Sequence, residues 1–236
     1  MTTKRIKVKV TTKKLNIKKI VIAIIILLCL IISVVYFIHQ PVKNIYITGN
    51  KYVKDKEILS ISKLNNYPPY INTYFMNIKE KLLKNDFIKN VKVKRKLPSK
   101  IYLEIEEYKP IAIYNDNIIL SSKKKIKNNN NLEYLPYILN NIDEVYDSFV
   151  NKFSKINDDV LLKISHIEYS PNEVDKERFI LYMVDSNYVY ITLSKIEKLN
   201  KYNLIVNELE NKKGIIYLDS GDYLEIKDWH NQIIII

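Results

Sequence analysis

The feature that most constrains this chain is an uncharged run near its amino terminus, residues 20–38 (IVIAIIILLCLIISVVYFI). As a helix, a run of this length rises about 28 Å, close to the hydrocarbon thickness of a bilayer, about 30 Å. Helices buried in soluble proteins are seldom apolar on every face over such a length, so the run predicts a membrane-spanning helix. A cleaved signal peptide would have a shorter apolar core followed by small residues, whereas this run exits through residues 36–41 (YFIHQP). We therefore expect an uncleaved membrane anchor.

The positive charge of the chain is concentrated just before this run. The net charge is +12, and residues 1–19 hold eight of the 38 Lys and Arg residues but no acid. The remaining residues carry 30 Lys and Arg against 26 Asp and Glu, which is nearly balanced and does not suit a nucleic-acid-binding protein. Because positive charges are retained on the cytoplasmic side, residues 1–19 are predicted to be cytoplasmic and residues 41–236 extracytoplasmic.

Residues typical of catalytic or metal sites are scarce outside the membrane run. The single cysteine, Cys29, lies within the run, so the folded part has no disulfide and depends on core burial. The three histidines have no second metal ligand at helical spacing; they are His39, His166 and His230. The three glycines are too far apart to form a phosphate-binding loop; they are Gly49, Gly214 and Gly221. We therefore expect no enzyme activity, no cofactor, no metal and no small-molecule substrate.

Residues 41–108 predict a small α+β unit with the order β-α-α-β-β. A strand is expected over 42–48, a short helix from Asp55, and a second helix over 74–85. Apolar residues then alternate with lysines before Leu97-Pro98-Ser99 and with glutamates after it, which indicates two strands joined by a tight turn. Both helices are expected on one face of the sheet.

Residues 109–236 predict a mixed α/β domain with a mainly antiparallel sheet. Helical spacing is found over 142–156 and 195–209, and the last strands are expected at 214–219 and 223–226. The run 123–131 (KKKIKNNNN) is expected to be a solvated loop, with a site for an anionic polymer as the alternative. An unpaired edge of the final strand pair could accept a strand from another chain, unless it is covered or charged.

The ordered set of these segments resembles a known family. Residues 42–50 (VKNIYITGN), 83–98, 101–107 and 109–112 are similar to the POTRA domain of the FtsQ/DivIB bacterial cell-division proteins. Residues 167–169, 180–185 and 214–219 are similar to the β domain of the Gram-positive DivIB branch, and the preceding membrane anchor matches this architecture.

The resemblance implies a non-enzymatic divisome scaffold at the division septum. Its β domain would bind single-span coiled-coil partners of the FtsB/DivIC and FtsL type and help to regulate septal peptidoglycan synthesis, and its POTRA domain would serve localisation or recruitment. The partner-binding residues that the resemblance implies are Ile215, Ile216, Tyr217, Leu218 and Tyr223 along a free strand edge, Trp229 beyond it, and Tyr202 beside it. Proline at position 217 is then expected to weaken binding by removing an edge hydrogen bond. Arg95 and Pro98 match the POTRA hairpin, where turn and strand-pair structure is the simpler interpretation.

Two other classes of protein remain open at this point. A membrane-anchored cell-wall enzyme should carry a recognisable nucleophile or metal-ligand set, which the sequence lacks. A POTRA-bearing assembly or transport factor should be followed by a membrane barrel, for which residues 109–236 offer no room.

Overall fold

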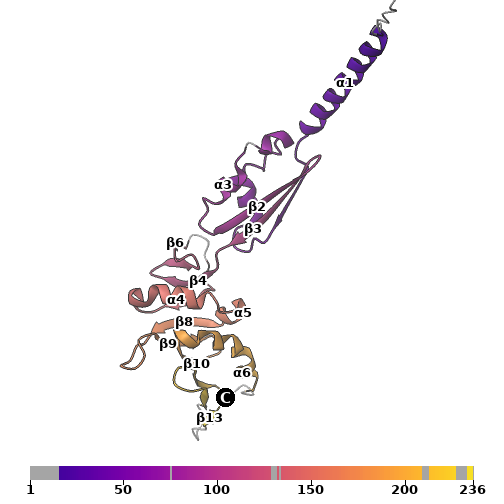
Figure 1. Cartoon of the computed structure of the whole chain (residues 1–236). Coiled ribbons are helices and arrows are strands. Elements are labelled where there is room, and N and C mark those ends of the chain that lie inside the picture. Colours follow the sequence, from indigo (N-terminus) through magenta and orange to yellow (C-terminus); the bar gives the residue numbers. More distant parts are fainter. Residues whose placement is uncertain are drawn as a thin grey trace, which may run out of the picture.

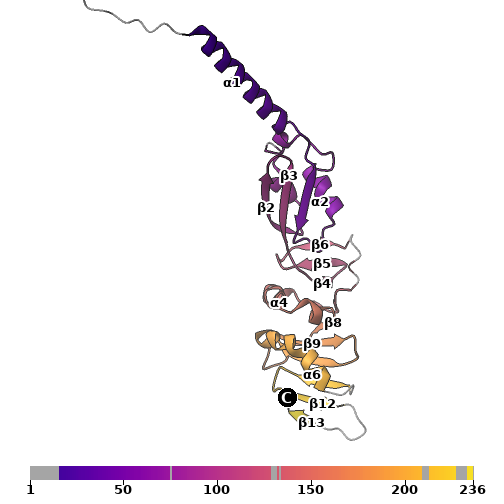
Figure 2. The same cartoon turned by 90° about the vertical axis from the view of Figure 1, so that its right-hand side faces the viewer.

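The parts of the molecule follow one another along a rod (Figure 1). The computed structural model describes residues 16–74, 76–128, 132, 134–208, 213–226 and 233–235. An isolated helix, α1 (Ile17–Ile38), projects from one end, a three-stranded sheet follows it, and a ten-stranded sheet forms the rest. The last strand, β13 (Ile233–Ile235), lies at the end farthest from α1 (Figure 2).

Helix α1 covers the whole of the predicted membrane run and begins three residues before it. None of its residues is buried against the rest of the protein. By length and composition, α1 is the one helix in the described part of the chain that could cross a membrane. An apolar helix that buries none of its residues against the protein needs an apolar solvent, which a membrane provides, as the predicted single-pass anchor requires.

The predicted β-α-α-β-β unit is confirmed. It comprises β1 (Asn44–Thr48), α2 (Asp55–Ser62), the 3-10 helix η1 (Tyr70–Tyr74), α3 (Ile78–Leu82), β2 (Ile88–Lys96) and β3 (Lys100–Glu107). The strand order is β1-β3-β2, with β1 parallel and β2 antiparallel to β3. The helix predicted over 74–85 is shorter than expected, because Asn77 adopts a left-handed conformation (φ 45°) that separates η1 from α3.

The ten-stranded sheet confirms the predicted mixed α/β domain. Its strands, in sheet order, are β13, β12 (Tyr223–Ile226), β11 (Gly214–Tyr217), β10 (Tyr188–Thr192), β9 (Arg178–Met183), β8 (Ile164–Tyr169), β7 (Tyr137–Ile138), β4 (Pro110–Tyr114), β5 (Asn117–Leu120) and β6 (Lys125–Lys127). The pairs β4–β7, β7–β8 and β10–β11 are parallel and the others antiparallel. Part of the predicted solvated loop is therefore β6, because Ile126 packs against the apolar core.

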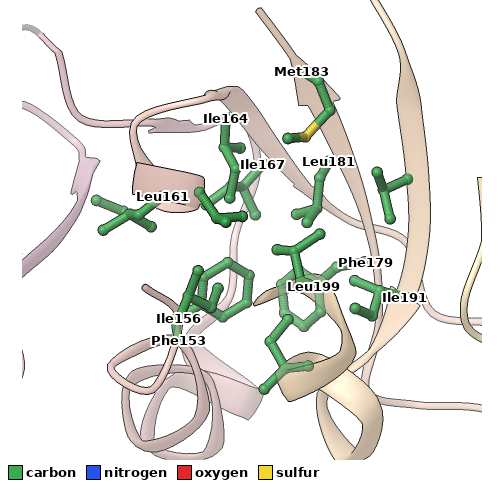
Figure 3. Close-up of a cluster of buried hydrophobic side chains, with 14 of the residues drawn as sticks. Phe153, Ile156, Leu161, Ile164, Ile167, Phe179, Leu181, Met183, Ile191 and Leu199 are labelled. Atoms are coloured by element: carbon green, nitrogen blue, oxygen red, sulfur yellow. The ribbon is translucent and has the colours of Figure 1, made fainter. Parts of the chain in front are cut away.

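Helices cover one face of this sheet and close its main core. They are η2 (Asp143–Val145), α4 (Tyr146–Phe153), α5 (Asp158–Leu161), η3 (Leu193–Lys201) and α6 (Tyr202–Glu208). Figure 3 shows Phe153 and Leu199 pointing from the helical side toward Phe179 and Leu181 of β9. Each helix predicted over 142–156 and 195–209 is divided into a 3-10 segment and an α-helix, and Leu209 lies outside the described residues.

Apolar packing continues across the junction between the two sheets. Ile113, Ile118 and Leu120 of the large sheet belong to the core of the small unit, whereas Ile111 and Ile119 face the larger core. The carboxylate of Glu107 accepts three backbone N–H groups, from Lys51 (2.7 Å), Tyr52 (2.8 Å) and Val53 (2.8 Å). The two units are joined by a shared apolar layer rather than by a linker. The domain boundary between residues 108 and 109 remains a prediction.

Candidate partner-binding surface

The end of the large sheet is formed by β11, β12 and β13. Strand β11 pairs with β10 on one side and with β12 on the other, and β12 pairs in turn with β13. The prediction that 214–218 forms a free edge is therefore wrong. Strand β11 is interior because β10 and β12 pair with its two sides, and the isoleucines near the carboxyl terminus form a further strand, β13, which pairs with β12 and is the outermost strand of the described sheet.

The predicted partner-binding residues divide between the two faces of the sheet. Ile216 and Leu218 are buried in the main core, whereas Ile215, Tyr217 and Tyr223 are half-buried on the open face. This division follows from the period of two along a strand. The open face can touch a partner, while Ile216 and Leu218 can only support it from beneath. Trp229 lies outside the described residues.

Tyr202 is a buried structural residue and not part of the surface. Its side chain is 1% exposed, and its hydroxyl donates to the carboxylate of Asp185 at 2.8 Å and accepts from Asn187 Nδ2 at 3.1 Å. Burial, together with the bond to Asp185, raises the pKa of Tyr202 far above its ordinary value. Asn187 Oδ1 in turn accepts the N–H of Gly214 at 2.9 Å, so Tyr202 holds the start of β11 in place. Direct contact between Tyr202 and a partner is thus ruled out by this packing.

The open face carries a band of tyrosines that the sequence analysis did not single out. We call it the tyrosine face: Tyr182, Tyr188, Tyr190, Tyr217 and Tyr223, with Ile180 and Ile215 between them. The ring centroids of Tyr190 and Tyr217 are 5.1 Å apart, and those of Tyr217 and Tyr223 are 4.5 Å apart, with both pairs stacked. The signal available in the sequence was the recurrence of tyrosine in the predicted strands of this region, with Tyr188 and Tyr190 at alternate positions of one strand. Such rings offer large, rigid contact area with polar ends, as protein interfaces commonly do.

The tyrosine face is flanked by acidic and basic groups that are already paired. Tyr217 donates to Glu225 at 3.2 Å, and burial together with this bond raises the pKa of Tyr217 to about 12. Arg178 Nε lies 2.7 Å from the Asp219 carboxylate, and both side chains are largely buried. Burial alone would raise the pKa of Asp219, but the hydrogen bonds from Arg178 and Ser220 outweigh it and lower the pKa. The tyrosine face is therefore mainly aromatic, with the carboxylates of Glu225 and Glu168 held at its tyrosine hydroxyls, and such a surface suits protein contact better than ion binding.

No group of three or more metal-ligating side chains is found in the described part of the chain. The Ser165 hydroxyl lies 2.6 Å from His166 Nδ1, but these are successive residues of β8, and His166 packs between the rings of Tyr137 and Tyr182. The histidine therefore serves as one more aromatic member of the open face.

Comparison with known proteins finds relatives of this chain. A model of the FtsQ-type POTRA domain matches residues 40–108. The cell division protein DivIB of Bacillus subtilis (strain 168) is 28% identical over 220 residues, which cover 86% of this chain and 82% of that protein. DivIB of Bacillus anthracis is 29% identical over 226 residues, covering 89% of this chain and 84% of the relative. Residues 40–108 are thus an FtsQ-type POTRA domain, and the chain is homologous to the DivIB cell division proteins over most of its length.

A solved structure of a DivIB domain is also similar to this chain. It is the major extracytoplasmic domain of the trans isomer of DivIB from Geobacillus stearothermophilus, at 22% identity and a TM-score of 0.38. The match covers 44% of this chain and 96% of that one.

The hairpin residues of the POTRA domain have structural contacts of their own. Arg95 Nη2 donates to the carbonyl of Thr73 at 2.7 Å, and its guanidinium lies 4.7 Å from the ring centroid of Tyr74. Arg95 thus ties η1 to the outer strand β2. Pro98 lies in the turn between β2 and β3. These contacts agree with the simpler interpretation of both residues as turn and strand-pair structure.

Proposed function

We propose that this protein is a non-enzymatic scaffold of the divisome that binds single-span coiled-coil partners of the FtsB/DivIC and FtsL type and helps to regulate septal peptidoglycan synthesis. The observation that carries the proposal is the free end of the large sheet, where the short strand β13 lies beside the tyrosine face, far from the membrane anchor (Figure 2). An outermost strand offers unpaired backbone groups, and an extended segment of a partner can continue the sheet there.

In this proposal one segment of the partner pairs alongside β13, and an adjoining segment lies across the open face. Ile215, Tyr217 and Tyr223 supply direct contacts, and the buried Ile216 and Leu218 hold their strands in register. Trp229 remains a predicted anchor beside this edge. Backbone pairing supplies affinity in such a complex, whereas the tyrosine side chains supply the choice of partner.

The orientation that we propose follows from the charge of the amino-terminal tail. With residues 1–19 held in the cytoplasm by eight positive charges, the POTRA domain and the large sheet lie outside the cell membrane. A reporter that is active only outside the cytoplasm, fused after Ile236, should then be active. Silence from a stably expressed fusion reverses the orientation.

The partner surface is tested by replacing one stacked tyrosine pair with threonine, which keeps the preference for strand structure. Tyr217→Thr/Tyr223→Thr should reduce recovery of small coiled-coil division proteins from crosslinked membranes. The matched control is Tyr46→Thr/Tyr102→Thr, which removes an equally stacked pair (4.8 Å between ring centroids) from the POTRA sheet. Partner recovery should be lost in the first variant and kept in the second.

Two results contradict the proposal. If both folded variants recover the same partners as the unaltered chain, the tyrosine face is not the binding surface. If no coiled-coil division protein is recovered with the unaltered chain despite stable expression, the scaffold function itself fails.

A further inference from the structure

The turn between β2 and β3 lies directly against the last turn of α1. Leu97 in this turn is 65% exposed. Together with Pro98 it lines a cavity of about 340 Å³ whose other walls are Val34, Phe37 and Ile38 of α1. All five lining residues are apolar, and three of them belong to the predicted membrane run.

The chain leaves little slack between α1 and the hairpin. Gln40 O accepts the N–H of Tyr70 at 2.9 Å, only two residues after α1 ends at Ile38. Lys43 N then donates to Ser99 O at 3.0 Å, one residue beyond Pro98. The POTRA domain is therefore fixed to the end of the membrane helix, and its β2–β3 turn lies beside that helix (Figure 1).

The depth of Leu97 follows from the helix geometry. Val34 lies four residues before Ile38, or about 6 Å along the helix axis toward the membrane centre. Leu97 and Val34 line the same cavity. The turn therefore lies deeper than the end of α1, toward the membrane centre, by a distance of this order. Since the hydrocarbon core ends near Ile38, a turn at this depth passes through the polar interfacial layer, which is about 5–8 Å thick on each side, and its tip reaches the acyl boundary.

The charges around the turn are of one sign. Between Asp86 and Glu104 the chain carries six cationic side chains and no acid: Lys89, Lys92, Lys94, Arg95, Lys96 and Lys100. Lys96 and Lys100 lie directly opposite each other across the hairpin. No ion pair is found for either of them among the residues that the structure describes. Like charges in directly opposed positions destabilise a strand pair, and an anion between them removes that cost.

We propose that the β2–β3 turn is a second membrane contact, in which Leu97 and Pro98 enter the interfacial layer and Lys96 and Lys100 bind anionic phospholipid headgroups. An apolar tip flanked by cations is suited to this layer, because the apolar part is buried at the acyl boundary while the ammonium groups stay among the headgroups. The exposed apolar area of one turn is too small for a stable protein interface, which needs about 800 Å² on each partner. A lipid surface continuous with the membrane around α1 has no such requirement.

Two membrane contacts would hold the rod differently from one. A single helix leaves the folded part free to tilt about its end, whereas a helix and a turn beside it fix the tilt. The free end of the large sheet would then stand at a defined height above the membrane. This inference depends on α1 spanning the membrane and not on the identity of any division partner.

The test uses the full chain in vesicles and a single tryptophan as a reporter. Starting from Trp229→Phe, Leu97→Trp places the reporter on the turn, and Val174→Trp places a control on the loop between β8 and β9, where Val174 is 97% exposed. In vesicles containing phosphatidylglycerol and brominated lipid, the reporter at position 97 should be quenched and the reporter at 174 should not. Equal and weak quenching at both positions overturns the membrane contact.

The headgroup part of the proposal has its own variant. Lys96→Gln/Lys100→Gln, combined with the reporter at 97, should lower the ratio of inserted to retracted turns by about thirtyfold in anionic vesicles. In phosphatidylcholine vesicles the same two replacements should change quenching little. Unchanged quenching of the glutamine variant in anionic vesicles shows that the lysines do not bind headgroups and overturns that part. Circular dichroism of each variant confirms that the fold is retained.

Discussion

Gly214, the first residue of β11, is the position where the end of the large sheet is most sensitive to one added methyl group. An ideal Cβ built there would lie 2.2 Å from the carbonyl oxygen of Glu225 and 3.1 Å from its carbonyl carbon. Real Cβ atoms almost never approach another atom closer than 3.0 Å, so β11 and β12 must separate by about 0.8 Å in Gly214→Ala. The obstacle is backbone, and no side-chain rotation can relieve the clash.

The cost of this separation can be estimated from two contributions. Forcing extra volume into a well-packed site costs about 1–3 kcal/mol. Moving residue 214 also weakens the buried hydrogen bond from its N–H to Asn187 Oδ1 (2.9 Å), worth about 1 kcal/mol. We therefore expect the free energy of unfolding of the large sheet to fall by about 2–4 kcal/mol.

The assay compares Gly214→Ala with a matched control in the full chain in nanodiscs. Gly221→Ala adds the same methyl group in the turn between β11 and β12, two residues before β12 begins, but there the Cβ meets only the movable ring of Tyr223 at 3.0 Å. Thermal unfolding should occur roughly 5–15 °C lower in Gly214→Ala and almost unchanged in Gly221→Ala. Hydrogen exchange should lose protection in β11 and β12 but keep it in β1, β2 and β3.

The outcome that refutes this reasoning is equal behaviour of the two variants. If Gly214→Ala unfolds at the temperature of the control and keeps exchange protection in β11, then β11 and β12 are not paired as described. Loss of protection in the POTRA sheet as well would show that the effect is global and not a local clash.

Three further perturbations have expected outcomes. Glu107→Gln keeps one acceptor oxygen but loses another, so the free energy of unfolding measured in urea should fall by about 2 kcal/mol. The control Glu106→Gln, at an exposed position, should change it very little. The pKa of Asp219 is lowered in the folded state by its hydrogen bonds, among them the one from Arg178. The stability from this pair is therefore present above the ordinary carboxyl pKa and is lost as pH falls from there through the lowered pKa. Below about pH 5, the free energy of unfolding should fall more steeply with decreasing pH in the unaltered chain than in Asp219→Asn. Arg95→Lys keeps the charge but not the planar guanidinium that reaches the Thr73 carbonyl. The free energy of unfolding, measured by thermal unfolding, should fall by about 1 kcal/mol. An unchanged value would show that charge alone matters.

The β2–β3 hairpin and the membrane span could be predicted because their causes are local. An uncharged run of sufficient length needs a membrane whatever its neighbours are, and α1 covers that run. Alternation of apolar residues with lysines and glutamates also defines two strands and their shared face without further information. The same reasoning correctly predicted that residues 41–108 form a β-α-α-β-β unit.

The end of the large sheet shows where such reasoning stops. Alternation predicts which residues of 214–226 share a face, and Ile215 and Tyr217 do share one. It does not say that β11 lies parallel to β10, or that β13 covers β12, because strand neighbours are selected by long-range packing and not by local pattern.

The sequence by itself determined the anchor, the small α+β unit and the general nature of the second domain, because each follows from periodicity and charge within a short segment. Only the tertiary structure decided that Tyr202 is buried against Asp185, that tyrosines of four strands form one face, and that Leu97 lies beside Val34. Each of these contacts joins residues far apart in the chain or on separate elements. Their partners are selected when the whole core packs, and no local pattern encodes that selection.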